Sequence, residues 1–248
     1  MNEQNIIGKY VPNFITLLSL SSGFTSIRFS LKGEWEIAIY LVLLATIFDF
    51  FDGWFARKLK SGSNFGAELD SLSDFVSFGV APSILVYLWS TNVLGSLGWG
   101  ATLFFVICSA LRLARFTADI YITNKPIDKN EYFTGVPSPA AAGLILLPLF
   151  IFFEFGIDVL KNEYLNVLTT TLIAFMMISK IPTISLKKIN INQKYKTWIF
   201  LIFVIACVAL ISKIWLTLII LFGCYILSIF FTIIQSRKVK TQLFSYTN

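Results

Sequence analysis

Histidine is absent from the 248 residues of this sequence. Its absence excludes a catalytic triad built on imidazole, a metal site that requires imidazole, and the commonest general base of enzymes. Three cysteines occur, Cys108, Cys207 and Cys224, and each lies inside an apolar run, so neither a disulfide framework nor a zinc site is expected. Any acid–base chemistry in this protein therefore has to be carried by carboxylates.

Charge is also scarce. Only 14% of the residues are Asp, Glu, Lys or Arg, whereas 56% are hydrophobic and the mean hydropathy is +0.75. This composition is typical of a chain that lies in a bilayer. The first ten residues lack the charged start, short apolar core and small-residue cleavage site of a secretory signal, so we expect the N-terminus to be retained.

Apolar runs of membrane-spanning length predict eight transmembrane helices. They cover residues 11–31, 35–56, 72–91, 97–116, 138–157, 164–181, 197–212 and 214–234. Little more than Ser212 and Lys213 separates the last two runs, which predicts a tight hairpin there. The sequence thus predicts an all-α polytopic membrane helix bundle forming a single domain over 1–248, with a six-helix core at about 8–182 and a further helix pair at about 197–234.

The distribution of basic residues predicts the orientation of these helices. If the N-terminus is cytoplasmic, sixteen of the twenty Lys and Arg residues lie on the cytoplasmic side. Both termini are then cytoplasmic, in a cell membrane. The net charge of +6 follows from this topology and from contact with lipid headgroups, and it does not indicate a nucleic-acid partner.

Two segments, DFFDGWFAR at 49–57 and GAELDSLSD at 66–74, place acidic residues in or beside spanning helices. An acid at the centre of such a helix costs roughly 2.5–3.5 kcal/mol, so the cost has to be offset by a partner. The spacings of three and four residues put each pair on one helix face, so two helices can bring four carboxylates together. These are Asp49, Asp52, Asp70 and Asp74. Divalent cations prefer such oxygen ligands, which predicts a metal site near the cytoplasmic face.

Small residues and an arginine accompany the acids. Gly53, Ala56 and Gly66 let a ligand or a facing helix approach the backbone, and Arg57 can reach a phosphate. Together with the metal these features indicate a site for a metal-bridged diphosphate. Interhelical ion pairs and a proton or cation pathway are the alternatives, but Arg57 alone cannot neutralise the four aspartates together with Glu68.

The two segments fill every position of Asp-x-x-Asp-Gly-x-x-Ala-Arg and, after eight residues, of Gly-x-x-x-Asp-x-x-x-Asp. This is the signature of the CDP-alcohol phosphotransferase family, which the chain resembles over roughly 8–235. The resemblance implies that the four aspartates bind two divalent cations, Mg²⁺ or Mn²⁺, that Asp74 is also the general base, and that the protein is a homodimer. It further implies a group of residues that bind the CDP-lipid: Asn13, Thr16, Gly53, Ala56, Arg57 and Ser63. Taken alone, Pro12, Asn13 and Thr16 would also suit an ordinary helix start.

Two further segments bear on the acceptor alcohol. SALRLARF at 109–116 and FTGVPSPAAAG at 133–143 resemble segments of the membrane-spanning phosphatidylserine synthases of this family. That resemblance implies transfer of a phosphatidyl group from CDP-diacylglycerol to the hydroxyl of L-serine, giving phosphatidylserine and CMP. Arg112 or Arg115 could hold the serine carboxylate, although anchoring at the cytoplasmic surface would also account for both. Ser138, between two prolines, could face the acceptor.

Other functions remain open from the sequence. An enzyme of the same family could use glycerol phosphate, inositol or an amino alcohol as acceptor. A transporter of protons or divalent cations is disfavoured because the last four predicted helices carry almost no charge in their interiors. A non-catalytic CDP-lipid binder would not require Asp74.

Overall fold

A computed structural model describes residues 3–59, 63–122, 133–179, 182–183, 201, 204 and 208–245. The longer helices are α1 (Glu3–Leu31), α2 (Trp35–Leu59), α3 (Asn64–Asp74), α4 (Ala81–Trp89), α5 (Ser96–Ile122), α6 (Ser138–Phe155), α7 (Glu163–Ile178) and α9 (Ile214–Ser245). A π-helix, η1 (Phe75–Val80), joins α3 to α4, and two 3₁₀ turns, η2 (Thr91–Leu94) and η3 (Asp158–Lys161), follow α4 and α6. Two short strands, β1 (Phe133–Thr134) and β2 (Pro182–Thr183), pair antiparallel.

Six helices in the described part of the chain are long and apolar enough to cross a membrane. They are Tyr10–Leu31, Trp35–Leu59, Asn64–Trp89, Ser96–Ala118, Ser138–Phe155 and Ile214–Thr232, and a shorter apolar helix covers Glu163–Ile178. The prediction of an all-α polytopic membrane bundle is confirmed. The predicted span at 197–212 falls largely outside the described residues, so the count of eight stays a prediction.

The third span differs from its prediction. The apolar run predicted a start near residue 72, but the helical stretch begins at Asn64, because Ser63 caps it by accepting a hydrogen bond from the Gly66 N–H at 3.0 Å. Its first turns carry the acids and a polar face, which lower the local hydropathy although the helix continues. The acidic segment is therefore part of one continuous helical span with α4.

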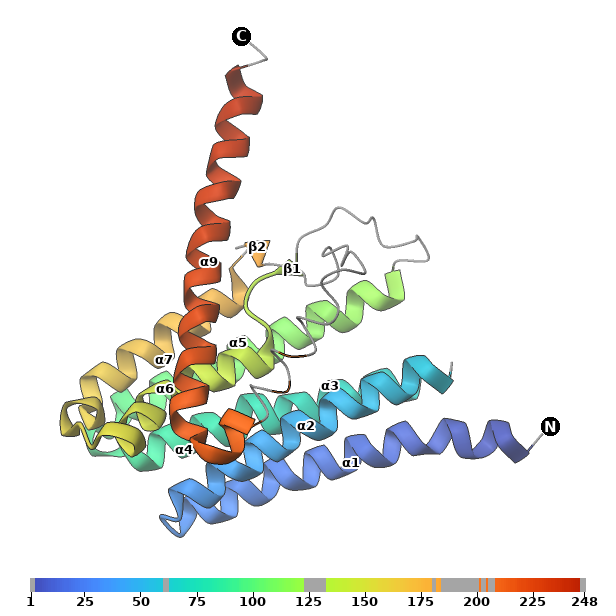
Figure 1. Ribbon diagram of the computed structural model, residues 1–248, viewed down its shortest axis with the longest axis horizontal. Coiled ribbons are helices and arrows are strands. Elements are labelled where there is room, and N and C mark those ends of the chain that lie inside the picture. The colour runs from blue at the N-terminus through green and yellow to red at the C-terminus, as the bar shows by residue number, and fades with distance from the viewer. Residues whose placement is uncertain are drawn as a thin grey trace.

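Figure 1 shows α1, α2 and α3 side by side, whereas α9 crosses the bundle steeply and its C-terminal end extends away from it. Within the bundle α9 packs mainly on α6. Phe222 of α9 covers Gly143 of α6, where any Cβ would overlap the ring. The side chains of Phe78, Phe105 and Phe150 lie fully buried in the centre. The core is therefore made by α2, η1, α4, α5, α6, α7 and α9 together.

Serine hydroxyls connect α1 to α2. The hydroxyl of Ser19 donates to the Ala45 carbonyl at 3.0 Å, and that of Ser26 donates to the Ala38 carbonyl at 2.8 Å. Small polar residues allow helix backbones to approach closely in a membrane, where each buried hydroxyl needs a partner. Helix α1 therefore has a polar face that holds the acid-bearing helix α2 at short range.

Candidate functional site

Three of the four predicted aspartates meet in space. Asp49 of α2 and Asp70 and Asp74 of α3 offer carboxylate oxygens that all lie within 4.8 Å of one another. Two full charges at this separation repel by about 3 kcal/mol at an effective dielectric constant of ~20, so three ionised groups are strongly unfavourable unless a cation or bound protons neutralise them. Oδ1 of Asp74 is buried and has no hydrogen-bond partner among the residues that the structure describes. An oxygen-only ligand set with an unpartnered, buried atom fits a hard divalent cation.

Asp52 lies outside this group of three. It sits one turn further along α2 and is 4% exposed, and within the described part of the chain its Oδ2 is likewise buried without a hydrogen-bond partner. Its side chain faces Thr16 of α1 and is within electrostatic range of Asp49 and Arg57. The structure therefore places Asp52 at the α1 side of the site, between the three-carboxylate group and the predicted nucleotide-binding element.

Hydroxyl contacts hold the acidic helix in place. The Ser73 hydroxyl donates to the Thr16 carbonyl at 3.2 Å, and the Ser77 hydroxyl donates to the Ser19 carbonyl at 3.2 Å. On another face of α3, the hydroxyls of Ser71 and Thr117 lie 3.0 Å apart. These contacts connect α3 and η1 to α1 and α5, so the positions of Asp70 and Asp74 depend on helices from three parts of the chain.

The helix changes its geometry directly after Asp74. The Ala81 N–H bonds to the Val76 carbonyl, the wider spacing of a π-helix, over the stretch Phe75–Val80. Inside this stretch Gly79 approaches α5 so closely that a Cβ there would lie 2.7 Å from Ser109 Oγ. A π-helical turn inserts one residue and rotates the chain that follows. The acidic face of α3 can thereby turn toward α2 while α4 turns an apolar face toward the core.

The residues predicted to bind the CDP portion form two groups. Asn13 Oδ1 and Ser63 Oγ lie 3.1 and 3.2 Å from the position that a Cβ of Gly66 would occupy, so this glycine lets α1 and the start of α3 meet. On α2, Nη1 of the exposed Arg57 lies 3.3 Å from a Cβ placed on Gly53, so the guanidinium folds back over that glycine. Ala56 is half-buried beside it.

The two candidate acceptor arginines differ in position. Arg112 is half-buried, donates from Nη1 to Ser138 Oγ at 3.1 Å, and is within electrostatic range of Asp74. Arg115 is exposed and donates to the Ile178 carbonyl at the end of α7, at 3.4 Å. The structure thus brings Arg112 to the aspartates and directs Arg115 elsewhere. It also brings Tyr225 of α9 to Arg112, and the only signal for this in the sequence was a phenol in the middle of an apolar run.

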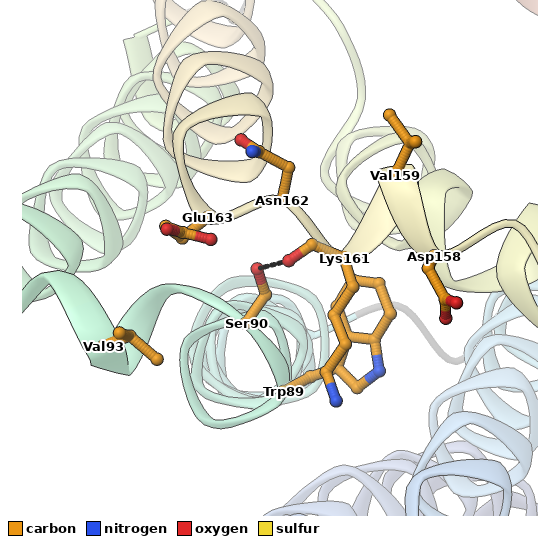
Figure 2. Close-up of a pocket in the computed structure, with 8 residues that line it drawn as sticks. All are labelled: Trp89, Ser90, Val93, Asp158, Val159, Lys161, Asn162 and Glu163. Atoms are coloured by element: carbon orange, nitrogen blue, oxygen red, sulfur yellow. Dashed lines mark hydrogen bonds between the residues drawn. The ribbon is translucent and has the colours of Figure 1, made fainter.

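A surface pocket lies far from this site. Figure 2 shows that it is lined by Trp89 and Ser90, which end α4, and by residues of η3 and the start of α7. The Ser90 hydroxyl donates to the Lys161 carbonyl at 2.9 Å, and Nδ2 of Asn166 donates to Ser90 Oγ at 3.1 Å. Fifteen residues separate Asp74 from Trp89, about 22 Å along a helix. These bonds join the loops at the opposite end of the bundle.

Residues 9–172 match the CDP-alcohol phosphatidyltransferase family, to which this chain belongs. Members of this family generally depend on divalent cations, in keeping with the three-carboxylate group.

Three individual proteins illustrate what this chain is similar to within the family. A CDP-diacylglycerol–serine O-phosphatidyltransferase of Mycobacterium leprae is 35% identical over 185 residues, which cover 75% of this chain and 61% of that protein. The protein of the same name from Methanocaldococcus jannaschii is 35% identical over 205 residues, 82% of this chain and 84% of that protein. An archaetidylserine synthase of Methanothermobacter thermautotrophicus is 38% identical over 151 residues, 57% of this chain and 59% of that protein.

Proposed function

We propose that this chain transfers the phosphatidyl group of CDP-diacylglycerol to the hydroxyl of L-serine, giving phosphatidylserine and CMP. The observation that carries the proposal is the three-carboxylate group with the half-buried Arg112 beside it. The acids suit a cation-bound diphosphate, and the arginine suits an acceptor that carries a carboxylate. The printed names of the relatives above also include serine or its lipid product.

Each residue of the site has its own role in the proposed transfer. Asp74 accepts the proton of the serine hydroxyl as the serine oxygen bonds to the lipid-side phosphorus, and the bond from that phosphorus to the CMP oxygen breaks. Arg57 pairs with the phosphate charge, and Arg112 pairs with the serine carboxylate. Two divalent cations, Mg²⁺ or Mn²⁺, held by Asp49, Asp52, Asp70 and Asp74, would neutralise charge on the diphosphate and on the departing CMP.

The displacement proceeds in one step. The sequence contains no histidine, and the proposed site uses no cysteine or serine as a nucleophile, so serine attacks the phosphorus directly. Direct in-line attack inverts the configuration at phosphorus, and retention would contradict it. The excess of basic residues on one side of the helices supports an active site that faces the cytoplasm. A single domain and a homodimer remain predictions for the whole chain.

An acceptor panel tests the proposal. The purified protein in detergent receives CDP-diacylglycerol, Mn²⁺ or Mg²⁺, and one labelled alcohol at a time: L-serine, glycerol phosphate, inositol or ethanolamine. We expect lipid product and CMP from serine in equal amounts, and loss of both on chelation of the metal. Product from another alcohol and none from serine would overturn the acceptor assignment. No product from any alcohol with metal present would overturn the proposed transfer itself.

A further inference from the structure

Two unused hydrogen-bond donors meet at Arg112, the arginine that lies within electrostatic range of Asp74. The hydroxyl of Tyr225 and Nε of Arg112 are both buried, and neither has a hydrogen-bond partner in the described residues. The two groups are within electrostatic range of each other. Most buried polar groups in proteins are paired, and those that are not call for an explanation such as a ligand.

The position of Arg112 connects this pair to the chemistry. Its Nη1 donates to the hydroxyl of Ser138, which is fully buried at the start of α6. The guanidinium also interacts with Asp74, the proposed base. A ligand held by Arg112 therefore lies close to the carboxylate that has to receive the acceptor's proton.

Packing of α9 places Tyr225 at this point. Leu218, Phe222, Tyr225 and Ile229 recur at spacings of four, three and four residues, which puts them on one face of the helix. Leu218 and Ile229 are buried, and Phe222 fills the space above Gly143 of α6. A phenylalanine at 225 would satisfy this apolar face equally well. The hydroxyl is thus not required for packing, and it adds a polar group with no partner in the described part of the chain.

The chemistry of the pair indicates what it binds. Nε of arginine can only donate a hydrogen bond, and a phenol next to a guanidinium is oriented to donate as well. Two neighbouring donors, one of them charged, match an acceptor-only group such as a carboxylate. The phosphate of the CDP-lipid has other candidate partners in Arg57 and in the cations that the aspartates would hold. A carboxylate on the acceptor alcohol is then the group left for Arg112 and Tyr225.

We propose that Tyr225 and Arg112 together bind the carboxylate of the acceptor amino acid, and that Ser138 positions the guanidinium for this contact. The inference rests on the proposed function and adds a specificity-determining residue to it. Tyr225 lies beyond residues 9–172, the part that matches the family. Helix α9 would therefore contribute to the choice of acceptor, while the transfer chemistry belongs to the matched part.

The substitution Tyr225→Phe tests the inference because it removes only the hydroxyl. A hydrogen bond to a charged group is lost, so we expect KM for L-serine to rise by about tenfold. KM for CDP-diacylglycerol and kcat should stay within about twofold, because neither the aspartates nor Arg57 changes. Tyr87→Phe is the matched control, since Tyr87 stacks edge-on with Trp99 near the far end of the bundle. The control should leave both KM values unchanged.

A second acceptor separates carboxylate binding from a general effect on the site. Ethanolamine keeps the hydroxyl and the ammonium of serine but has neither a carboxylate nor another carbonyl oxygen, and it is measured as a competing acceptor or inhibitor. Its apparent affinity should be the same for the wild type and for Tyr225→Phe. A serine KM within twofold of the wild-type value, or an equal loss of affinity for ethanolamine, would overturn the inference.

A double substitution tests whether the two side chains hold the same group. If they do, the fold-increase in serine KM for the double variant should be smaller than the product of the fold-increases for Arg112→Lys and Tyr225→Phe. A double-variant increase equal to that product would contradict a shared carboxylate. Failure of this inference differs from failure of the proposed function: in the first case the wild type uses serine and Tyr225→Phe behaves like it, whereas in the second the wild type does not use serine.

Discussion

The substitution Asp74→Asn separates a catalytic role of this residue from a structural one. It keeps the size of the side chain but removes its charge and its ability to accept the serine proton. Loss of a general base commonly lowers a rate by about 10²–10⁴-fold, so kcat should fall at least about 100-fold. Binding of CDP-diacylglycerol should persist, because the other acids and Arg57 remain.

The same substitution should make the metal-free fold more stable, although it lowers kcat. Three carboxylates whose oxygens lie within 4.8 Å of one another form three repulsive pairs, and Asp74→Asn removes two of them. At about 3 kcal/mol for each pair of full charges, the upper limit of the relief is about 6 kcal/mol, and proton uptake by the free acids reduces it. In a metal chelator the variant should therefore unfold at a higher temperature than the wild type.

The assay measures three quantities in detergent: kcat with serine, binding of CDP-diacylglycerol, and the midpoint of thermal unfolding in EDTA. Asp158→Asn is the matched control, because Asp158 is an exposed residue of η3 near the far end of the bundle. The control should leave all three unchanged. A value of kcat within threefold of wild type would refute the role of Asp74 as base. A lower unfolding temperature together with lost lipid binding would show that the residue supports the fold instead.

Three further predictions concern other residues. Asp49→Asn should raise the Mn²⁺ concentration for half-maximal activity by tenfold or more, because one of three clustered ligands is lost; an unchanged metal titration would contradict this. Arg112→Lys should raise serine KM, whereas the exposed Arg115→Lys should leave it within twofold, and equal effects would contradict the difference in position. Gly143→Ala should lower the unfolding temperature by displacing Phe222, at a cost of about 1–3 kcal/mol, and an unchanged midpoint would contradict that packing.

The helical architecture could be predicted because membrane insertion depends on local composition. A run of about twenty apolar residues is sufficient evidence for a span, and five of the predicted starts lie within a few residues of the observed helices. The start at Asn64 was missed because the acids of α3 lower the mean hydropathy of a stretch that is still helical. The π-helix at Phe75–Val80 was missed because it depends on packing partners such as Ser109, which are distant in sequence.

In the candidate site, too, local features could be predicted from the sequence, whereas contacts between helices could not. The spacings within the two acidic segments are local, so the sequence by itself determined which carboxylates share a helix face and that a partner has to offset their charge. Which oxygens meet is a property of two helices in contact, and only the tertiary structure placed Asp49, Asp70 and Asp74 in one group and Asp52 beside it. Likewise, Arg112 and Arg115 lie three residues apart and are chemically alike. Their surroundings, with Ser138 and Tyr225 on one side and the end of α7 on the other, come from helices remote in sequence, so only the fold could distinguish them.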